Sequence, residues 1–409
     1  MNAIVLSLLL ISSNWAIENV TIHTGDGTVL KNATILVRNG VITNIGKRVP
    51  YPKTIKRING TGKVLTPGFI ESQSQLGLTE VSGVQSTNDH SIDGDGFTPA
   101  FRVADGFNPH STRIPINRNE GVTGAILSPK GGVLAGTGNY VPLTGSLRHR
   151  PNPAKPLALF GSVTSSASRH AGNTRGGLWM KLREFFAEVR LYRQHTAAIN
   201  RGQFRPLQFS PFQLQATLPV IKRTIPIVLR VNRASDILDA LRFARSEGLD
   251  LIIAGGSEAW MVADELARQK VPVIVRPSIH GPSSFDSLNS SPTLATKLHE
   301  AGVRVLISAG GWAQNARRLR QEAGIAVANG LPWEVALRAI TLNPAEVFSL
   351  PKTGALKKGY GANMVLWDGD PFEFRSQVTR LFINGKDTPL EDRQLQLARR
   401  YQPPPSPAD

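Results

Sequence analysis

The sequence predicts a mixed α/β protein in which a (β/α)8 barrel of the TIM type carries a small β-sandwich built from both ends of the chain. Three observations predict this fold. The middle of the chain repeats short, fully apolar strands and amphipathic helices. The first and last segments alternate apolar and polar residues, as antiparallel strands do. The 409 residues, of which 41% are hydrophobic, suffice for one large and one smaller domain.

Seven segments of the middle region have the apolar character of strands in a parallel sheet covered by helices. These predicted strands span 69–70, 121–127, 157–160, 225–231, 251–254, 271–275 and 303–307. Their alternation with helical segments is the pattern of a (β/α)8 barrel, and the sequence does not place the eighth strand. A doubly wound open sheet is the alternative, but no dinucleotide-binding fingerprint supports it.

Alternating segments at the two chain ends predict the β-sandwich. They span 17–22, 33–38, 41–45, 362–367 and 378–383. Asn39-Gly40 and Asn384-Gly385 are typical hairpin-turn pairs. The expected domains are therefore a composite β-sandwich at 17–65 and 352–390, a barrel at 66–351, and a C-terminal tail at 391–409 whose run 403–407 is proline-rich and disordered.

Three long segments interrupt the barrel pattern. Segments 77–120 and 128–155 are rich in Gly and Ser and follow predicted strands. In a barrel, long loops on that side form the site and its lid. Segment 178–204 has the pattern of an inserted amphipathic helix.

The first 16 residues have the features of a signal peptide. An apolar run at 3–11 is followed by small and polar residues, with a cleavage position after Ala16. The run is too short to span a bilayer. The alternative is a first buried strand of the mature fold. We expect an exported, periplasmic protein, because a complete strand pattern begins directly after Ala16.

The composition is strongly basic, with 47 Lys and Arg against 30 Asp and Glu and a formal net charge of +17. Such a charge favours anionic partners. The basic residues are scattered and no nucleic-acid-binding motif occurs, so no specific nucleic-acid partner is expected, whereas an anionic envelope surface is a possible partner. The chain has no cysteine, which excludes disulfides and thiolate chemistry.

The stretch Val64-Leu-Thr-Pro-Gly-Phe-Ile-Glu-Ser-Gln-Ser-Gln75 has a Pro-Gly breaker, an apolar dipeptide and a polar run, as where a buried strand opens into a site. Together with the motifs at 329–345, 354–359 and 365–371, it makes the chain resemble the amidohydrolase superfamily, in particular its imidazolonepropionase-like branch. The resemblance covers nearly the whole chain after Ala16. It implies a barrel hydrolase of non-peptide C–N bonds, such as those of cyclic amides, that uses a divalent metal.

Other residues stand where the resemblance implies metal ligands. Gln73 and Gln75 replace the His-x-His pair, and Arg230 replaces a His or carbamylated Lys. The runs 254–257 and 308–311 hold Ala-Gly-Gly-Ser and Ser-Ala-Gly-Gly in place of a His and an Asp. Amides are weak metal ligands, and a guanidinium binds no cation. We therefore expect no metal or other cofactor and a catalytically degenerate site.

Arg230 suggests a different chemistry. In the former metal pocket, its permanent charge would bind a carboxylate or phosphate bidentately. The alternative is that Arg230 pairs with a local acid such as Glu258 and only stabilises the barrel.

Glu80, Asp89 and His280 are further pocket candidates near the predicted barrel mouth. No two of the eight histidines have ligand spacing. The segment 89–95 has the acidic density of a calcium loop but lacks the later Glu of an EF-hand.

Three functional hypotheses follow. The first is a metal-free pseudoenzyme that binds a small anionic or amide-containing ligand with Arg230, Gln73 and Gln75. The second is an active amidohydrolase with a non-standard site around Glu80, Asp89 and His280. The third is a cationic protein that interacts with the envelope surface. The sequence assigns no catalytic residue and no oligomeric state.

Overall fold

The computed structural model of the chain describes residues 14–94 and 96–402. The strands are β1 (Trp15–His23), β2 (Val29–Arg38), β3 (Val41–Gly46), β4 (Lys56–Asn59), β5 (Val64–Pro67), β6 (Phe69–Ser74), β7 (Val122–Leu127), β8 (Leu134–Gly138), β9 (Tyr140–Pro142), β10 (Ala158–Ser162), β11 (Ile227–Val231), β12 (Leu251–Gly255), β13 (Val273–Val275), β14 (Val305–Ile307), β15 (Met364–Trp367), β16 (Val378–Ile383) and β17 (Lys386–Thr388).

The α-helices are α1 (Arg113–Arg118), α2 (Arg175–Asn200), α3 (Pro211–Ile221), α4 (Ala234–Glu247), α5 (Ala263–Arg268), α6 (Leu294–Glu300), α7 (Leu319–Ala328), α8 (Trp333–Ala339), α9 (Leu342–Val347) and α10 (Arg393–Tyr401). In the described ranges, no helix is long and apolar enough to cross a bilayer. Residues 1–13 of the expected signal segment and the proline-rich run 403–407 lie outside those ranges.

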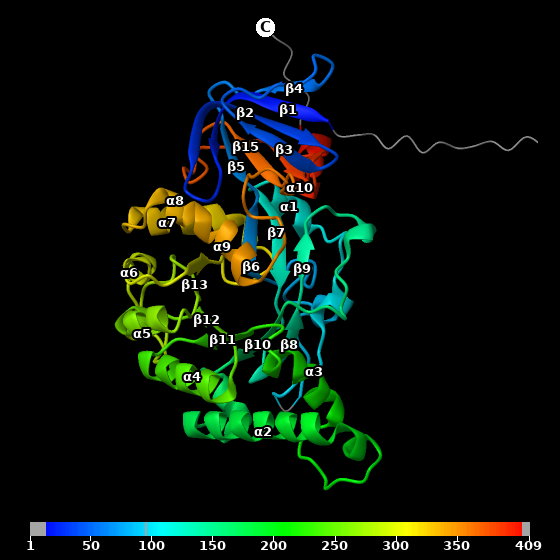
Figure 1. Ribbon diagram of the computed structural model, residues 1–409, viewed down its shortest axis with the longest axis vertical. Helices are drawn as coiled ribbons and strands as arrows, with labels where there is room; N and C mark the ends of the chain where they lie inside the picture. The colour runs from blue at the N-terminus through cyan, green and yellow to red at the C-terminus, as the bar shows by residue number, and fades with distance from the viewer. Residues whose placement is uncertain (1–13, 95, 403–409) are drawn as a thin grey trace, which may run out of the picture.

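Strands from both chain ends pair in one eight-stranded sheet. Its order is β17-β16-β15-β5-β1-β2-β3, with β4 paired to β1. The antiparallel pair of β5 and β15 joins the two ends of the chain. Figure 1 shows this sheet at one end of the long axis, with α2 and α3 at the other. The pairing confirms that both ends build one small β region, while its division into two sandwich layers stays a prediction.

β1 begins two residues before the expected signal-peptide junction. Trp15 and Ala16 are both buried and pair with β2. The Trp15 ring stacks on Phe382 with 4.2 Å between ring centroids, and its Nε1 donates a hydrogen bond of 2.9 Å to the Gly385 carbonyl. Trp15 therefore connects the first strand to the C-terminal strands.

The middle of the chain confirms the mixed α/β prediction. β10 to β14 are parallel neighbours in chain order, and β6 pairs in parallel with β7. Ser74, at the end of β6, forms a parallel bridge with Gly311, which follows β14. On the other side, β9 pairs antiparallel with β7, and β8 pairs antiparallel with β10. Figure 1 shows α4, α5 and α6 along one side of β11, β12 and β13.

The expected loop at 128–155 contains β8 and β9, so that part of the prediction was wrong. Glycine is depleted from strands, which hid β8 (Leu134-Ala-Gly-Thr-Gly138) in the sequence pattern. The backbones approach so closely here that a Cβ atom on Gly138 would lie 2.0 Å from the Leu127 carbonyl oxygen. A glycine is therefore required at this place.

Two helical regions extend the sequence prediction. The expected helical insertion at 178–204 is α2, whose apolar face packs into the main core. The expected C-terminal tail begins with a helix, α10. Its N-cap is Asp392, whose carboxylate accepts a hydrogen bond of 2.9 Å from the Leu395 amide. The run of good helix formers that follows this cap explains why the segment forms a helix and not an irregular tail.

Side chains of the middle strands alternate between two hydrophobic clusters. One cluster takes residues from each of seven strands together with Phe348, and its strand members are Ile70, Ile126, Ala158, Phe160, Val228, Ile252, Ala254, Ile274 and Leu306. Neighbouring residues on the same strands, such as Ile227 and Leu229 on β11, belong to the larger cluster that packs against the helices. We call the first group the interior cluster.

Glu71 links β6 to the chain that follows β14. Its buried carboxylate accepts hydrogen bonds from the Ser308 hydroxyl at 2.5 Å, the Ala309 amide at 2.9 Å and the Gln73 amide at 3.2 Å. Burial raises the pKa of Glu71 from its ordinary value of 4.5 to about 7, although the three hydrogen bonds lower it. The link is therefore a buried carboxyl group that titrates near neutral pH.

We predict that Glu71 makes the protein less stable as the pH rises. Because its folded pKa lies above the unfolded value, its stabilising contribution is complete below pH 4.5 and is lost as the pH rises through 7. Raising the pH from below 4.5 to above 7 should therefore lower the free energy of unfolding by about 3 kcal/mol. Urea denaturation of wild type and Glu71→Gln at pH 4.5 and 8 measures it, with Glu373→Gln as a carboxylate control. The same pH dependence in wild type and Glu71→Gln would contradict the prediction.

We also predict that Trp15 is a stability anchor. Trp15→Ala should lower the free energy of unfolding by about 3–5 kcal/mol, because it removes a buried aromatic side chain and a buried hydrogen bond. Tyr401→Ala, which truncates an exposed aromatic side chain in α10, should change it by about 0.5 kcal/mol or less. Equal denaturation midpoints for the two variants would refute the role assigned to Trp15.

Candidate functional site

A cavity of about 510 Å³ lies at the carboxyl ends of the parallel strands. Its walls come from the ends of β6, β7 and β10 to β14 and from the loops that follow them. In parallel α/β folds, this edge of the sheet is where ligands bind. The cavity is therefore the candidate site.

The alternation of side chains explains which residues form the cavity floor. Residues two positions apart on a strand point to the same side. Five polar residues follow a member of the interior cluster by two positions and line the cavity: Ser128, Ser162, Arg230, Arg276 and Ser308. The floor is therefore the polar layer directly above the apolar interior.

The described lining residues carry positive charge and no negative charge. Lys130, Arg169, Arg230 and Arg276 line the cavity, and no Asp or Glu of residues 14–94 and 96–402 is among the lining residues. Arg230 and Lys130 have no carboxylate within ion-pair distance in the described part of the chain. The cavity is thus suited to an anion.

Arg230 lies at the centre of this charge. Its side chain faces the cavity, and one guanidinium nitrogen donates a hydrogen bond of 3.4 Å to the Gln73 amide oxygen. Burial among protein atoms lowers the pKa of Arg230, and the charge of Arg276 lowers it further. The alternative pairing with Glu258 is not found, because that carboxylate accepts hydrogen bonds of 3.0 Å from the Ala234 and Asn289 amides.

Arg276 is held by a buried acid outside the cavity. Its Nε lies 3.2 Å from the Glu322 carboxylate, which also accepts hydrogen bonds from the amide and hydroxyl of Ser278. Gly310 has φ of 93°, and a Cβ atom there would lie 2.7 Å from an Arg276 guanidinium nitrogen. A glycine at 310 therefore leaves room for the arginine to lie across the strand ends.

Lys130 and Trp312 meet at the edge of the cavity. The Lys130 ammonium lies 4.0 Å from the centre of the Trp312 ring, a cation–π contact between the loops that follow β7 and β14. Burial lowers the pKa of Lys130, and the charge of Arg230 lowers it further. Arg230 is thus close enough to act electrostatically on both Lys130 and Arg276.

The two glutamines add neutral hydrogen-bonding groups. Gln73 and Gln75 both line the cavity at the end of β6. The Gln75 side chain is only 4% exposed, and its buried amide oxygen has no hydrogen-bond partner among the described residues. A buried acceptor of this kind favours a ligand that donates a hydrogen bond.

The other predicted pocket residues do not line the cavity. The Glu80 carboxylate accepts a hydrogen bond of 3.2 Å from Thr112. Asp89 lies in the loop between β6 and α1, where its backbone amide donates a hydrogen bond to the Leu78 carbonyl. Glu258 accepts hydrogen bonds from the Ala234 and Asn289 amides, as described above. His280 Nδ1 lies 3.3 Å from the Pro277 carbonyl oxygen. The structure therefore brings together Gln73, Gln75 and Arg230 and leaves these four apart.

Sequence reasoning missed Arg276 and the charged role of Lys130. Arg276 directly follows β13 and lies two residues after the interior residue Ile274, so extending the strand alternation by one step would have found it. Lys130 opens a glycine-rich run whose sequence suggests a flexible loop. Its place at the end of β7, after the predicted strand at 121–127, was the available signal.

The residues present do not fit the divalent metal that the resemblance implies. Within residues 14–94 and 96–402, no group of three or more His, Cys, Asp or Glu side chains could hold a metal ion. The strand ends instead present amides, hydroxyls and guanidinium groups. This donor set lacks the imidazoles and carboxylates that zinc, nickel and iron select.

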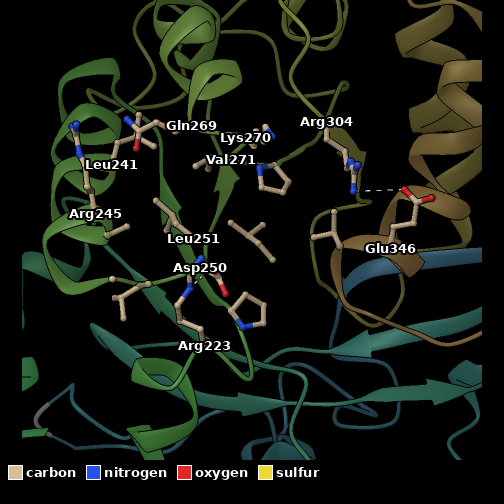
Figure 2. Close-up of a pocket in the computed structure, with 17 residues that line it drawn as sticks. Arg223, Leu241, Arg245, Asp250, Leu251, Gln269, Lys270, Val271, Arg304 and Glu346 are labelled. Atoms are coloured by element: carbon tan, nitrogen blue, oxygen red, sulfur yellow. Dashed lines mark hydrogen bonds and ion pairs between the residues drawn. The ribbon is translucent and has the colours of Figure 1, made fainter. Parts of the chain in front are cut away.

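A second hollow of about 570 Å³ lies at the opposite, amino ends of β12 to β14 (Figure 2). It also carries basic residues, but two of them are neutralised. Arg223 pairs with Asp250 at 2.5 Å, and Arg304 lies 3.6 Å from Glu346. Arg245, in the last turn of α4, complements the negative helix end. These three charges have a structural explanation, whereas Arg230 and Lys130 of the first cavity have no carboxylate within ion-pair distance among the described residues.

Comparison with known proteins agrees with this fold. Residues 229–388 match the model of the amidohydrolase family. The structure is similar to that of an amidohydrolase from Thermotoga maritima MSB8, with a TM-score of 0.83 and 26% sequence identity. The likeness covers 91% of this chain and 99% of the Thermotoga chain.

Two further known proteins are similar to this chain at lower sequence identity. The structure of an adenosine deaminase from Xanthomonas campestris with bound zinc is similar with a TM-score of 0.53 and 17% sequence identity. The alignment covers 94% of this chain and 96% of the Xanthomonas chain, and this likeness concerns the fold alone. The amidohydrolase tasK of Hapsidospora irregularis is 20% identical over 386 residues, which are 86% of this chain. The match spans 39% of the length of that relative. Together, the family match over residues 229–388 and the nearly complete structural likeness to the Thermotoga protein make this chain similar to amidohydrolases over most of its length.

Proposed function

We propose that this protein is a metal-free pseudoenzyme of the amidohydrolase superfamily, close to its imidazolonepropionase-like branch, whose cavity binds a small organic anion. The observation that carries the proposal is the charge of the lining. Lys130 and Arg230 face one cavity with no carboxylate partner among the residues that the structure describes, and Arg276 lies beside them. Like charges in a partly desolvated space repel one another, and a bound anion relieves that repulsion.

The architecture that we propose around the cavity is a closed (β/α)8 barrel with a two-layered β-sandwich. Seven parallel strands and the antiparallel run of β8 and β9 supply eight places in the ring. The bridge between Ser74 and Gly311 supports closure, because it joins the two ends of the series. The interior cluster, to which all seven parallel strands contribute, supports it independently.

The proposal that the site is metal-free rests on the chemistry of its donors. In a metal-dependent hydrolase, the ion lowers the pKa of a bound water and polarises the carbonyl. A guanidinium has no lone pair for a metal and does not replace that function, but it binds a carboxylate through two parallel hydrogen bonds. Arg230 is therefore suited to holding an anion rather than to activating water.

The alternative of an active hydrolase gains no support from the cavity. Its proposed centre was Glu80, Asp89 and His280, and none of these residues lines the cavity. Glu71 is buried beneath the strand ends and is committed to hydrogen bonds with Ser308 and Ala309. The ligand-binding proposal uses only residues that face the cavity.

We predict that Arg230 determines anion affinity. Isothermal titration calorimetry with succinate should give saturable binding to the wild type that Arg230→Met weakens by roughly 10- to 100-fold, the loss expected for hydrogen bonds between charged groups. Arg245→Met removes an exposed arginine at the opposite strand ends and should leave the affinity unchanged. Circular dichroism checks that both variants are folded.

Elemental analysis of the same samples completes the test. The proposal expects no stoichiometric zinc, nickel or iron and no effect of a chelator on succinate binding. A stoichiometric metal, or equal succinate binding by wild type and Arg230→Met, would overturn it.

We also propose that the chain is exported and that its signal segment ends before Trp15. Cleavage after Ala16 would remove Trp15 and its contacts with Phe382 and Gly385. N-terminal sequencing of protein recovered from the periplasm should therefore find a start at or before Trp15. A mature chain that starts at Ile17 would contradict this prediction.

A further inference from the structure

Apolar side chains stand at the mouth of the cationic cavity. Ile279 and Trp312 both line the cavity, yet they are 43% and 39% exposed, which places them at its entrance. Phe285 and Leu288, on the same loop as Ile279, are also exposed, and in the sequence each directly follows a lining residue, Ser284 and Ser287 respectively. We call Ile279, Phe285, Leu288 and Trp312 the apolar rim.

The loop that carries most of this rim is firmly held. Asp286 is buried and accepts hydrogen bonds of 2.8 and 2.9 Å from the amide and hydroxyl of Ser165, and it also pairs with Arg175. Asn289 donates from its amide to the Glu258 carboxylate at 3.0 Å. These anchors directly flank Phe285 and Leu288.

This anchored loop exposes large apolar side chains to water, which is unfavourable, and no packing contact within the described part of the fold requires that exposure. Phe285 is 85% exposed, the largest fraction among the exposed large apolar side chains of the described residues. Its neighbour Asp286 is buried, so the backbone there is fixed while the aromatic ring faces water. Apolar groups gathered beside a polar pocket are typical of a binding surface.

We propose that the ligand of this cavity is an anionic amphiphile: a small carboxylate whose charged group pairs with Arg230 and whose short aliphatic or aromatic tail covers the apolar rim. This inference rests on the proposed anion-binding function and adds the substrate class. The cationic floor and the apolar entrance match the two ends of such a molecule in charge and in polarity. The cavity volume of about 510 Å³ also suits a small molecule.

A homologous series of acids tests the tail. Isothermal titration calorimetry of the full-length protein with propanoate, butanoate, hexanoate and octanoate should show the affinity rising up to about fourfold per added methylene, as burial of apolar surface requires. 1-Octanol, which has a tail but no charge, should bind at least tenfold more weakly than octanoate. Arg230→Met should reduce the affinity for every acid in the series.

Rim variants test the place of the tail. Ile279→Ser and Phe285→Ser should each weaken octanoate binding by roughly three- to tenfold and leave propanoate binding nearly unchanged. Phe374→Ser is the matched control, because Phe374 is 75% exposed and the described chain after Trp312 contributes no residue to the cavity lining. It should leave the affinity for both acids unchanged.

The outcomes separate this inference from the proposed function. Equal affinities from propanoate to octanoate, all dependent on Arg230, would overturn the amphiphile and keep the anion site. No binding of any acid or of succinate would overturn both. Association with phosphatidylglycerol vesicles without binding of soluble octanoate would identify the rim as a membrane-docking surface and also overturn the inference.

Discussion

The alternation of side chains along the parallel strands is the constraint on which the site depends. It divides each strand between the interior cluster and the helix-facing core. One more step of the same alternation brings Ser128, Ser162, Arg230, Arg276 and Ser308 to the layer above the interior. The apolar layer below and the polar layer above are therefore consequences of one register. A shift of one residue in any of these strands would place a guanidinium or hydroxyl among the helices.

Electrostatics within the polar layer is only partly balanced. Glu322 neutralises Arg276 from outside the cavity, and Gln73 offers Arg230 a neutral acceptor. Glu71, a buried carboxyl group on β6, is directed at Ser308 and Ala309, and burial raises its pKa. The positive potential therefore remains open to the cavity. That is the property by which an anion would be selected over a neutral compound of the same size.

The sequence predicted the regular parts of the fold and part of the site. The strands at 225–231 and 251–254 and those at the chain ends were found because long apolar or alternating runs leave little ambiguity. β8 was not predicted because its glycines, required by the close backbone contact at Gly138, give the segment a composition typical of a loop. Gln73, Gln75 and Arg230, which line the cavity, were chosen as candidates through their positions in motifs. Glu80, Asp89 and His280 were placed from loop membership alone, which does not determine where a side chain points.

In the proposed metal-free site, Arg230 changes what this edge of the sheet can do. A metal ion binds a carbonyl and a water together and so joins recognition to hydrolysis. A guanidinium retains the positive charge and the preference for carboxylates but leaves water unactivated. For a ligand that is bound and not hydrolysed, the affinity depends on every surface that the ligand covers, including the mouth of the cavity. In the proposed site, the firmly anchored loop that carries Ile279 and exposes Phe285 contributes to binding, because apolar burial there adds affinity for a small anion.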